Sequence, residues 1–171
     1  MPYIQNLLGV LTILGQLLFV LTILGLLIKK NNAWTNFLKN NSIWLILIVS
    51  LTAMLGSLYF SDYLGYEPCK LCWYQRIALY PIVVLTLAAL IKKDKNITHY
   101  TLWLAIIGGL IALNHYILQI TNVSILPCSA VGYSQSCAQV FTLQFGYITI
   151  PLMAFTAAVL IVTLSLLARR R

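Results

Sequence analysis

The sequence predicts an all-α, polytopic membrane protein, and two features of its composition favour this fold class. Of the 171 residues, 61% are hydrophobic and only 8% are charged, and so small a charged fraction does not cover the surface of a soluble protein of this size. The apolar residues also gather in five runs, each close to the roughly 20 residues with which a helix crosses a bilayer. These runs span residues 7–28, 43–60, 73–91, 101–120 and 145–168.

The first run is interpreted as a retained helix rather than as a cleaved signal peptide. A signal peptide carries positive charge before its apolar stretch, whereas residues 1–6 contain no lysine or arginine and two lysines, Lys29 and Lys30, follow the run. Residues 1–41 are therefore expected to form an N-terminal transmembrane helix and a cytoplasmic linker.

The other four runs carry features of packed transmembrane helices. Residues 43–60 and 101–120 contain small side chains, which let neighbouring helices approach closely. The third run begins directly after a Cys-x-x-Cys and holds Arg76, the only lysine or arginine within any run, and the fifth run ends at three arginines. No long polar segment remains for a separate soluble domain.

The net charge of +8 comes from the helix ends and does not indicate a nucleic-acid partner. Basic residues follow the first, third and fifth runs, namely Lys29, Lys30, Lys39, Lys92, Lys93, Lys95 and Arg169, Arg170 and Arg171. Short basic loops stay in the cytoplasm, and at the opposite ends Lys70 is the only lysine or arginine. The sequence thus predicts an N-terminus outside, a C-terminus in the cytoplasm, and outer loops at residues 61–71 and 121–144.

All four cysteines, Cys69, Cys72, Cys128 and Cys137, lie in or beside these outer loops, where disulfides can form and persist. Cys69 and Cys72 form a Cys-x-x-Cys at the start of a helix, whose N-terminus stabilises a thiolate. In many zinc sites, one of the two pairs of ligands has this same spacing. The eight residues between Cys128 and Cys137 are polar and contain a glycine. A disulfide can close this loop, and a purely structural crosslink is the alternative interpretation.

Arg76 follows Cys72 by four residues, so the two side chains are expected on one helix face, with Gln75 beside them. A guanidinium that begins to enter a membrane is costly and usually marks function. It can stabilise a thiolate at Cys72 or donate to a carbonyl oxygen of a docked ring, and snorkelling to lipid phosphates is the alternative. His115 is expected at the same level on the neighbouring helix, either at that ring or as a packing residue.

The ordered set of motifs resembles the DsbB/BdbC family of disulfide bond formation proteins, most closely its BdbC branch. The similarity runs from about residue 42 to residue 168. It is carried by residues 53–61, by EPCKLCWYQR at residues 67–76, by Tyr80 with Pro81, by residues 115–119, by Pro127 with Cys128, by Cys137, and by residues 145–151.

The resemblance implies an antiparallel four-helix transmembrane bundle at residues 42–171 in a bacterial cytoplasmic membrane, to which the first helix is additional. It implies a protein-disulfide oxidoreductase that reoxidises a soluble thioredoxin-like thiol oxidase, similar to DsbA or BdbD, and reduces ubiquinone or menaquinone. Cys128 would then receive the partner's attack with Cys137 as its pair, and Cys69 and Cys72 would pass two electrons onward. The quinone would meet Cys72 beside Arg76, with Gln75 and His115 at the same site.

Two other functions remain open. Vitamin K epoxide reductases also pair loop cysteines with a Cys-x-x-Cys at a helix entrance, but there the active pair comes late in the chain. A non-catalytic zinc site held by four outward thiolates is the second alternative, disfavoured because an oxidising compartment favours disulfides. A transporter is disfavoured further, because the five runs contain no acidic residue.

Overall fold

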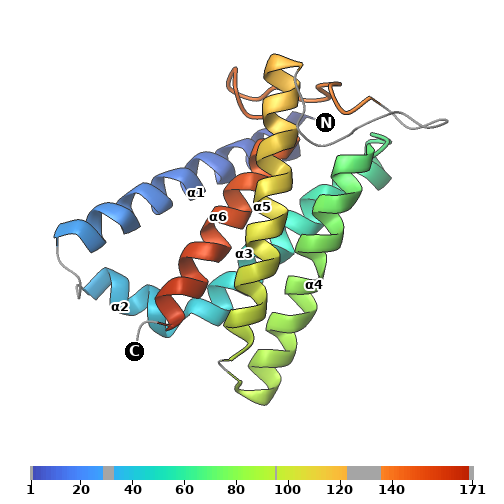
Figure 1. The fold of residues 1–171 in the computed structure, drawn as a ribbon. Coiled ribbons are helices and arrows are strands. Elements are labelled where there is room, and N and C mark those ends of the chain that lie inside the picture. The colour runs from blue at the N-terminus through green and yellow to red at the C-terminus, as the bar shows by residue number, and fades with distance from the viewer. Residues whose placement is uncertain (1, 29–32, 95, 123–135, 170–171) are drawn as a thin grey trace.

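The computed structural model describes residues 2–28, 33–94, 96–122 and 136–169, and these residues are predominantly helical (Figure 1). The elements are α1 (Pro2–Ile28), α2 (Ala33–Asn40), α3 (Ser42–Leu58), the π-helix η1 (Tyr59–Tyr63), α4 (Lys70–Lys92), α5 (Ile97–Thr121) and α6 (Ile150–Arg169). Within the described residues, five helices are long and apolar enough to cross a membrane. The predicted all-α, polytopic membrane fold is confirmed.

Four of these helices form a closed bundle. Helix α3 packs on α4, α4 on α5, α5 on α6, and α6 returns to α3, while α1 lies outside this ring and contacts mainly α6. In Figure 1, α1 crosses the bundle obliquely, and its C-terminal end diverges from α6 toward α2. The fold is thus the expected four-helix bundle with one additional N-terminal helix.

Small residues on α5 allow two neighbouring helices to approach closely. A Cβ atom built on Gly108 would lie 3.1 Å from Leu79 Cδ2 of α4, and one on Gly109 would lie 3.2 Å from Ala158 Cβ of α6. Each glycine therefore serves one interface, as expected where helices associate in lipid.

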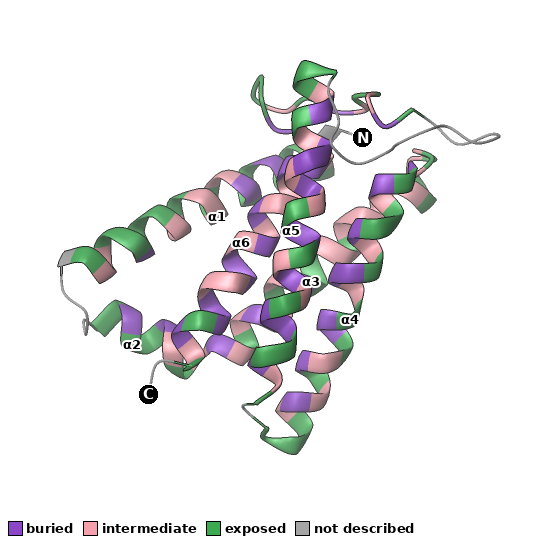
Figure 2. Cartoon of the chain, viewed as in Figure 1, coloured by how far each residue is buried: buried purple, intermediate pink, exposed green. Residues whose placement is uncertain are grey.

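The burial pattern separates an interior from a lipid-facing surface. Ile46, Ile82, Ala105 and Ile161 are fully buried between the helices. Figure 2 shows that exposed residues also occur along every long helix, and many of these are large hydrophobic residues. Val84 on α4, for example, is 68% exposed. Apolar side chains on both faces are typical of helices whose outer surface contacts lipid.

The two ends of the bundle differ in chemistry. The end of α4, the start of α5, helix α2 and the end of α6 lie toward one end, and the start of α4 and the end of α5 lie at the other (Figure 1). The first of these ends carries Lys39, Lys92, Lys93 and Arg169, and the second carries Cys69 and Cys72. The charge asymmetry expected from the sequence is therefore an asymmetry of the folded molecule.

Three local features differ from the sequence-based expectations. The expected linker contains the short amphipathic helix α2, which buries Thr35 and Leu38. Helix α3 ends in the π-helical turn η1. Helix α6 begins at Ile150 and not at residue 145, because Phe145 and Gly146 have φ angles of 52° and 80° in a tight turn closed by backbone hydrogen bonds between Gln144 and Ile148.

Candidate functional site

Cys69 and Cys72 occupy the first turn of α4. Cys69 is the N-cap residue, with an extended backbone at φ −71° and ψ 173°, and its carbonyl oxygen accepts a hydrogen bond from the Trp73 N–H at 3.1 Å. The preceding Pro68 cannot donate a backbone hydrogen bond and so favours a helix start just after it. The chain therefore places both sulfur atoms at the end of the helix where N–H groups are unpaired.

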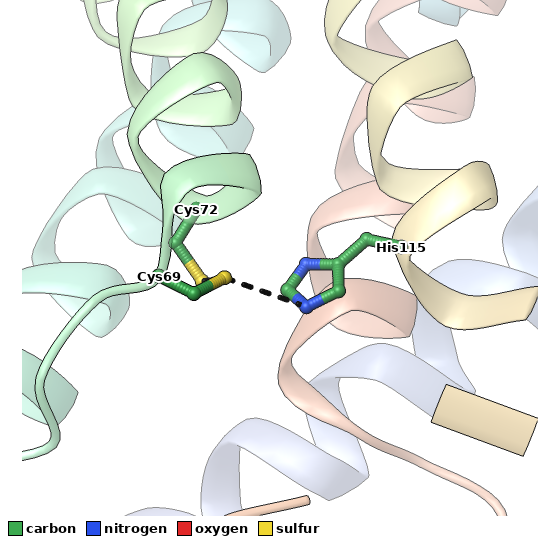
Figure 3. A group of neighbouring side chains, drawn as sticks. All are labelled: Cys69, Cys72 and His115. Carbon is green, nitrogen blue, oxygen red and sulfur yellow. Dashed lines mark hydrogen bonds between the residues drawn. The ribbon is translucent and has the colours of Figure 1, made fainter. Parts of the chain in front are cut away.

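The two sulfur atoms lie 3.2 Å apart and belong to free thiols. Figure 3 shows them pointing from the start of α4 toward His115 on α5. Cys69 is buried, and Cys72 is partly buried. The pair is thus close enough to form a disulfide by a small side-chain rotation, since the Sγ atoms of a disulfide lie about 2.05 Å apart.

His115 connects this pair to the segment that contains Cys137. Its Nε2 atom lies 3.1 Å from the Cys137 carbonyl oxygen and 3.7 Å from Cys69 Sγ. Its Nδ1 atom lies 2.9 Å from Gln75 Nε2. A carbonyl oxygen can only accept, so the ring proton resides on Nε2, and in the neutral ring Nδ1 then accepts from the Gln75 amide.

Hydrogen bonding lowers the pKa of Cys69. The Cys72 thiol donates to Cys69 Sγ, and this contact is the largest cause of the shift; burial opposes it, and His115 adds to it. The net result is a pKa well below the usual thiol value, which favours the thiolate form that takes part in disulfide exchange.

The second cysteine pair is only partly within the described residues. Cys137 is 2% exposed and disulfide-bonded, and its side chain belongs to a small buried cluster with Cys69, Leu71 and Leu118. Cys128, predicted to receive the partner's attack, lies outside the described residues. The structure therefore brings three of the four predicted redox cysteines to one place.

Arg76 lies on α4 and is anchored to the end of α3. Its Nε atom donates to Ser57 Oγ at 3.1 Å, and one terminal nitrogen donates to the Ser57 carbonyl oxygen at 3.2 Å. Its guanidinium carbon also lies 5.2 Å from the centre of the Trp73 ring. These contacts hold a positive charge at the helix face that carries Cys72.

A cavity of about 340 Å³ opens beside Arg76 and Cys72. Its lining is mostly apolar and comes from α1, α3, η1, the segment before α4, α4, α6 and residue Phe141, and its polar residues include Glu67, Gln75, Arg76 and Tyr80. Phe60, Tyr66 and Phe141 form a consecutive stack along part of the lining, with ring centres 6.2 Å and 4.9 Å apart. The cavity therefore offers flat aromatic surfaces and a localised positive charge.

His115 does not line this cavity, contrary to the expectation that it and Arg76 face one ring. It lines a second, much smaller cavity with Cys69, Ser136 and Gln139. The physical reason is that its ring is turned toward the Cys137 carbonyl oxygen. Gln75 belongs to the wall of the large cavity and also contacts the His115 ring. Gln75 therefore lies between the large cavity and His115.

Several site residues were not predicted as binding residues. Ser57 was noted only as a small residue, and Phe141 carried no signal at all because it follows an irregular loop. Tyr80 shows the clearest missed signal: it follows Arg76 by four residues and therefore shares its helix face. Its buried hydroxyl has no hydrogen-bond partner among the described residues.

Cys69, Cys72 and His115 are also a possible metal-binding group, because their ligand atoms all lie within 4.8 Å of one another. A tetrahedral zinc site with Zn–S bonds of about 2.3 Å would separate two sulfur atoms by about 3.8 Å. The observed 3.2 Å is shorter, and the His115 Nε2 atom that faces the sulfur already carries a proton. The geometry fits a thiol pair better than a zinc site.

Comparisons with known proteins agree with the sequence motifs. The family model described as disulfide bond formation protein DsbB matches residues 39–168. The probable disulfide formation protein C of Halalkalibacterium halodurans is 45% identical over 72% of this chain and 89% of its own length. The disulfide bond formation protein C of Bacillus subtilis is 41% identical over 73% of this chain and 91% of its own length. No solved structure matches the chain.

Proposed function

Because the chain belongs to the DsbB family of disulfide bond formation proteins, we propose that it reoxidises an extracytoplasmic thioredoxin-like thiol oxidase. The two electrons pass through its two cysteine pairs to a quinone dissolved in the membrane. Such a route requires a membrane protein, since the acceptor stays in the lipid and the donor protein stays outside it.

One observation carries this proposal: Cys72 lines both cavities of the site. On one side it lines the small cavity with Cys69, His115 and Ser136, and there it packs in the buried cluster that contains Cys137 of the second cysteine pair. On the other side it faces the large apolar cavity with Arg76. A sulfur atom between a protein-facing site and a lipid-like site is suited to transfer electrons from one to the other.

The proposed reaction is a series of thiol–disulfide exchanges. A thiolate of the partner attacks the disulfide of Cys128 and Cys137, and its second thiol then releases an oxidised partner and a reduced pair. The reduced pair opens a disulfide between Cys69 and Cys72 in the same way. The dithiol of Cys69 and Cys72 finally closes to a disulfide and gives up two electrons and two protons. A quinone accepts the two electrons and the two protons and becomes a quinol.

The large cavity fits the head of a quinone. Its 340 Å³ falls at the lower end of the usual range for small-molecule sites, which are mostly apolar with a few placed polar groups. A quinone ring is flat and has two carbonyl oxygens, so it needs aromatic walls and hydrogen-bond donors. Phe60 and Tyr66 supply such walls, and the candidate donors are Arg76 and the Tyr80 hydroxyl, which has no partner among the described residues.

The test is turnover of purified full-length variants with a water-soluble quinone analogue. Cys69→Ala and Cys72→Ala are each expected to abolish quinone reduction, whether the electrons come from a reduced thioredoxin-like partner or from a small dithiol. Cys137→Ala is expected to abolish oxidation of the partner but to leave quinone reduction by the small dithiol. Normal turnover of either Cys69→Ala or Cys72→Ala would refute the proposal.

Arg76 gives a second, independent test of the quinone site. Arg76→Ala is expected to raise the KM for quinone by at least about tenfold, because a charge-assisted hydrogen bond contributes about 1.5–3 kcal/mol. Helix content should stay native, as judged by circular dichroism. Lys70→Ala is the control, since Lys70 is exposed on the same helix and lies outside the cavity. An unchanged KM in Arg76→Ala would exclude a role in quinone binding.

The closeness of Cys69, Cys72 and His115 leaves one alternative function to test, a structural zinc site. Metal analysis of the protein purified without chelators separates the two functions. Stoichiometric zinc that stays bound in air, together with an absence of quinone reduction, would favour the zinc site.

A further inference from the structure

Helix α1 is not explained by family membership. The family match begins at residue 39, whereas α1 spans Pro2–Ile28. Four family helices already form a closed bundle. Any role of α1 must therefore follow from where it packs in this particular chain.

Helix α1 forms part of the wall of the large cavity. The residues of α1 that line it are Leu8, Leu11, Thr12, Leu14, Gly15 and Leu18. Most of these positions are three or four residues apart, which places them along one stripe of the helix. Leu8, Gly15 and Leu18 on this stripe are partly buried and Thr12 is buried. Leu11 and Leu14 at its edge are 42% and 54% exposed, and Leu7 and Leu17 off the stripe are 56% and 54% exposed. One face of α1 is thus turned toward the cavity and another toward lipid.

Close contacts seat this face on α3 and α6. A Cβ atom on Gly15 would lie 3.0 Å from Leu160 Cδ1 of α6, and a Cβ atom on Gly56 of α3 would lie 3.3 Å from Leu8 Cδ2. Leu160 and Gly56 themselves line the cavity. Helix α1 therefore covers cavity-lining residues of both helices, and without it this side of the cavity would face lipid.

Polar contacts hold α1 in this position. The Tyr147 hydroxyl donates to Gln16 Oε1 at 3.0 Å, and Gln16 Nε2 lies 3.4 Å from Thr156 Oγ1 of α6. Gln5 Nε2 lies 3.4 Å from the hydroxyl of Tyr66, which is itself a cavity residue. Interhelical hydrogen bonds of this kind favour a specific association of helices in lipid.

We infer that α1 is a selectivity wall of the acceptor site, which encloses one side of the cavity and contacts the quinone ring and the first part of its tail. This inference rests on the proposed function. A more enclosed apolar site shields more of the ring from lipid and restricts its orientation beside Cys72, so α1 affects quinone binding and not the sulfur chemistry. The leucines of α1 thereby influence which ring and tail sizes are accepted.

The test compares two matched pairs of substitutions in the full chain. Leu8→Ala with Leu18→Ala removes apolar contact from the cavity face, and Leu7→Ala with Leu17→Ala removes the same number of atoms from the lipid face. With a small dithiol as reductant, the KM for quinone is expected to rise at least about tenfold in the first pair, since a lost apolar contact in a binding pocket has effects of this order. The second pair should stay close to the native KM, and kcat at saturating quinone should be similar in all three proteins.

A photoreactive quinone analogue provides a measurement on the unaltered protein. It is expected to label peptides within residues 8–18, and excess quinone should prevent the labelling. If the native chain reduces quinone but both variant pairs share one KM and residues 8–18 stay unlabelled, the inference about α1 is wrong and the proposed function stands. If the native chain reduces no quinone and takes up no label that quinone displaces, both are wrong.

Discussion

At the scale of single residues, His115 has the most specific geometry in the site. Its Nε2 proton is directed at both the Cys137 carbonyl oxygen and Cys69 Sγ, so one ring contacts a residue of each cysteine pair. Gln75 fixes the ring from the other side. The ring therefore sets the separation between the backbone at Cys137 and the sulfur of Cys69, and we interpret His115 as a positioning residue.

Replacing His115 should slow electron transfer between the cysteine pairs. His115→Ala is expected to lower its rate by about tenfold or more, because misplacing reacting groups by about 1 Å has effects of up to a hundredfold. The KM for quinone with a small dithiol should not change. His115→Gln keeps an N–H donor and should recover part of the rate. Rapid mixing of reduced partner with each variant measures this step.

The second histidine of the chain provides the control. His99 lies near the start of α5, where it contacts Tyr100 and Trp103, and His99→Ala should transfer electrons at the native rate. Native transfer in His115→Ala as well would contradict the positioning role.

The lowered pKa of Cys69 leads to a prediction with a defined sign. The Cys72 thiol is the largest cause of a pKa of about 4, so Cys69 should remain a thiolate as the pH falls until it approaches that value. Cys72→Ala removes the donor while burial still opposes ionisation, so the midpoint should rise toward or above the usual thiol value of about 8.5. Thiolate absorbance in the ultraviolet, followed against pH, measures the midpoint.

Cys72→Ser is the informative companion variant, because a serine hydroxyl still donates to Cys69 Sγ. Its midpoint should lie below that of Cys72→Ala. Equal midpoints in the native chain and in Cys72→Ala would show that the hydrogen bond between the sulfur atoms does not control the ionisation of Cys69.

At the scale of elements, the five transmembrane helices could be predicted because length and hydropathy alone decide whether a segment can cross a bilayer. Their ends could not. Helix α6 begins five residues later than expected because Phe145 adopts a left-handed backbone, which no apolar pattern indicates. The short helix α2 was missed because its apolar residues, such as Trp34 and Leu38, are interleaved with polar ones.

The contact between α4 and α5 depends on Gly108. A side chain there would meet Ala78 Cβ at 3.2 Å and Leu79 Cδ2 at 3.1 Å, and overpacking of this kind costs about 1–3 kcal/mol. Gly108→Val should therefore lower the free energy of unfolding by an amount in this range. Leu110→Val on the same helix is the control, because Leu110 is 63% exposed and faces outward. Reversible unfolding in mixed micelles compares the two, and equal stability would exclude a close-packed interface at Gly108.

At the scale of the whole molecule, the sequence indicated which side chains would lie close together. It did not indicate which of them would line the large cavity and which the small one. Helical spacing was sufficient to place Cys72 and Arg76 on one face, and the level of His115 in the membrane was sufficient to bring it near Cys69 and Cys72. The division into two cavities depends on the rotation of α5 and on the course of the chain around Cys137, neither of which is encoded in a local pattern. The contribution of α1 to the cavity was missed for the same reason.

The two chemically distinct ends of the bundle lead to a prediction about orientation. Basic residues gather at the end that contains Lys92, Lys93 and Arg169, and the cysteine site lies at the opposite end. From the positive-inside rule we expect the basic end in the cytoplasm, and the proposed partner requires the cysteine end outside. A single cysteine introduced at either end reports the orientation.

In a chain whose four native cysteines are replaced by alanine, Gln139→Cys should react with a membrane-impermeant thiol reagent in intact cells. Asp94→Cys should react only after the membrane is permeabilised. Both positions are exposed, so a difference between them reflects the membrane and not burial in the protein. Labelling of Asp94→Cys in intact cells, with Gln139→Cys protected, would place Cys69 and Cys72 on the cytoplasmic side. An extracytoplasmic oxidase could not then reach them, and the proposed route from partner to quinone would be excluded.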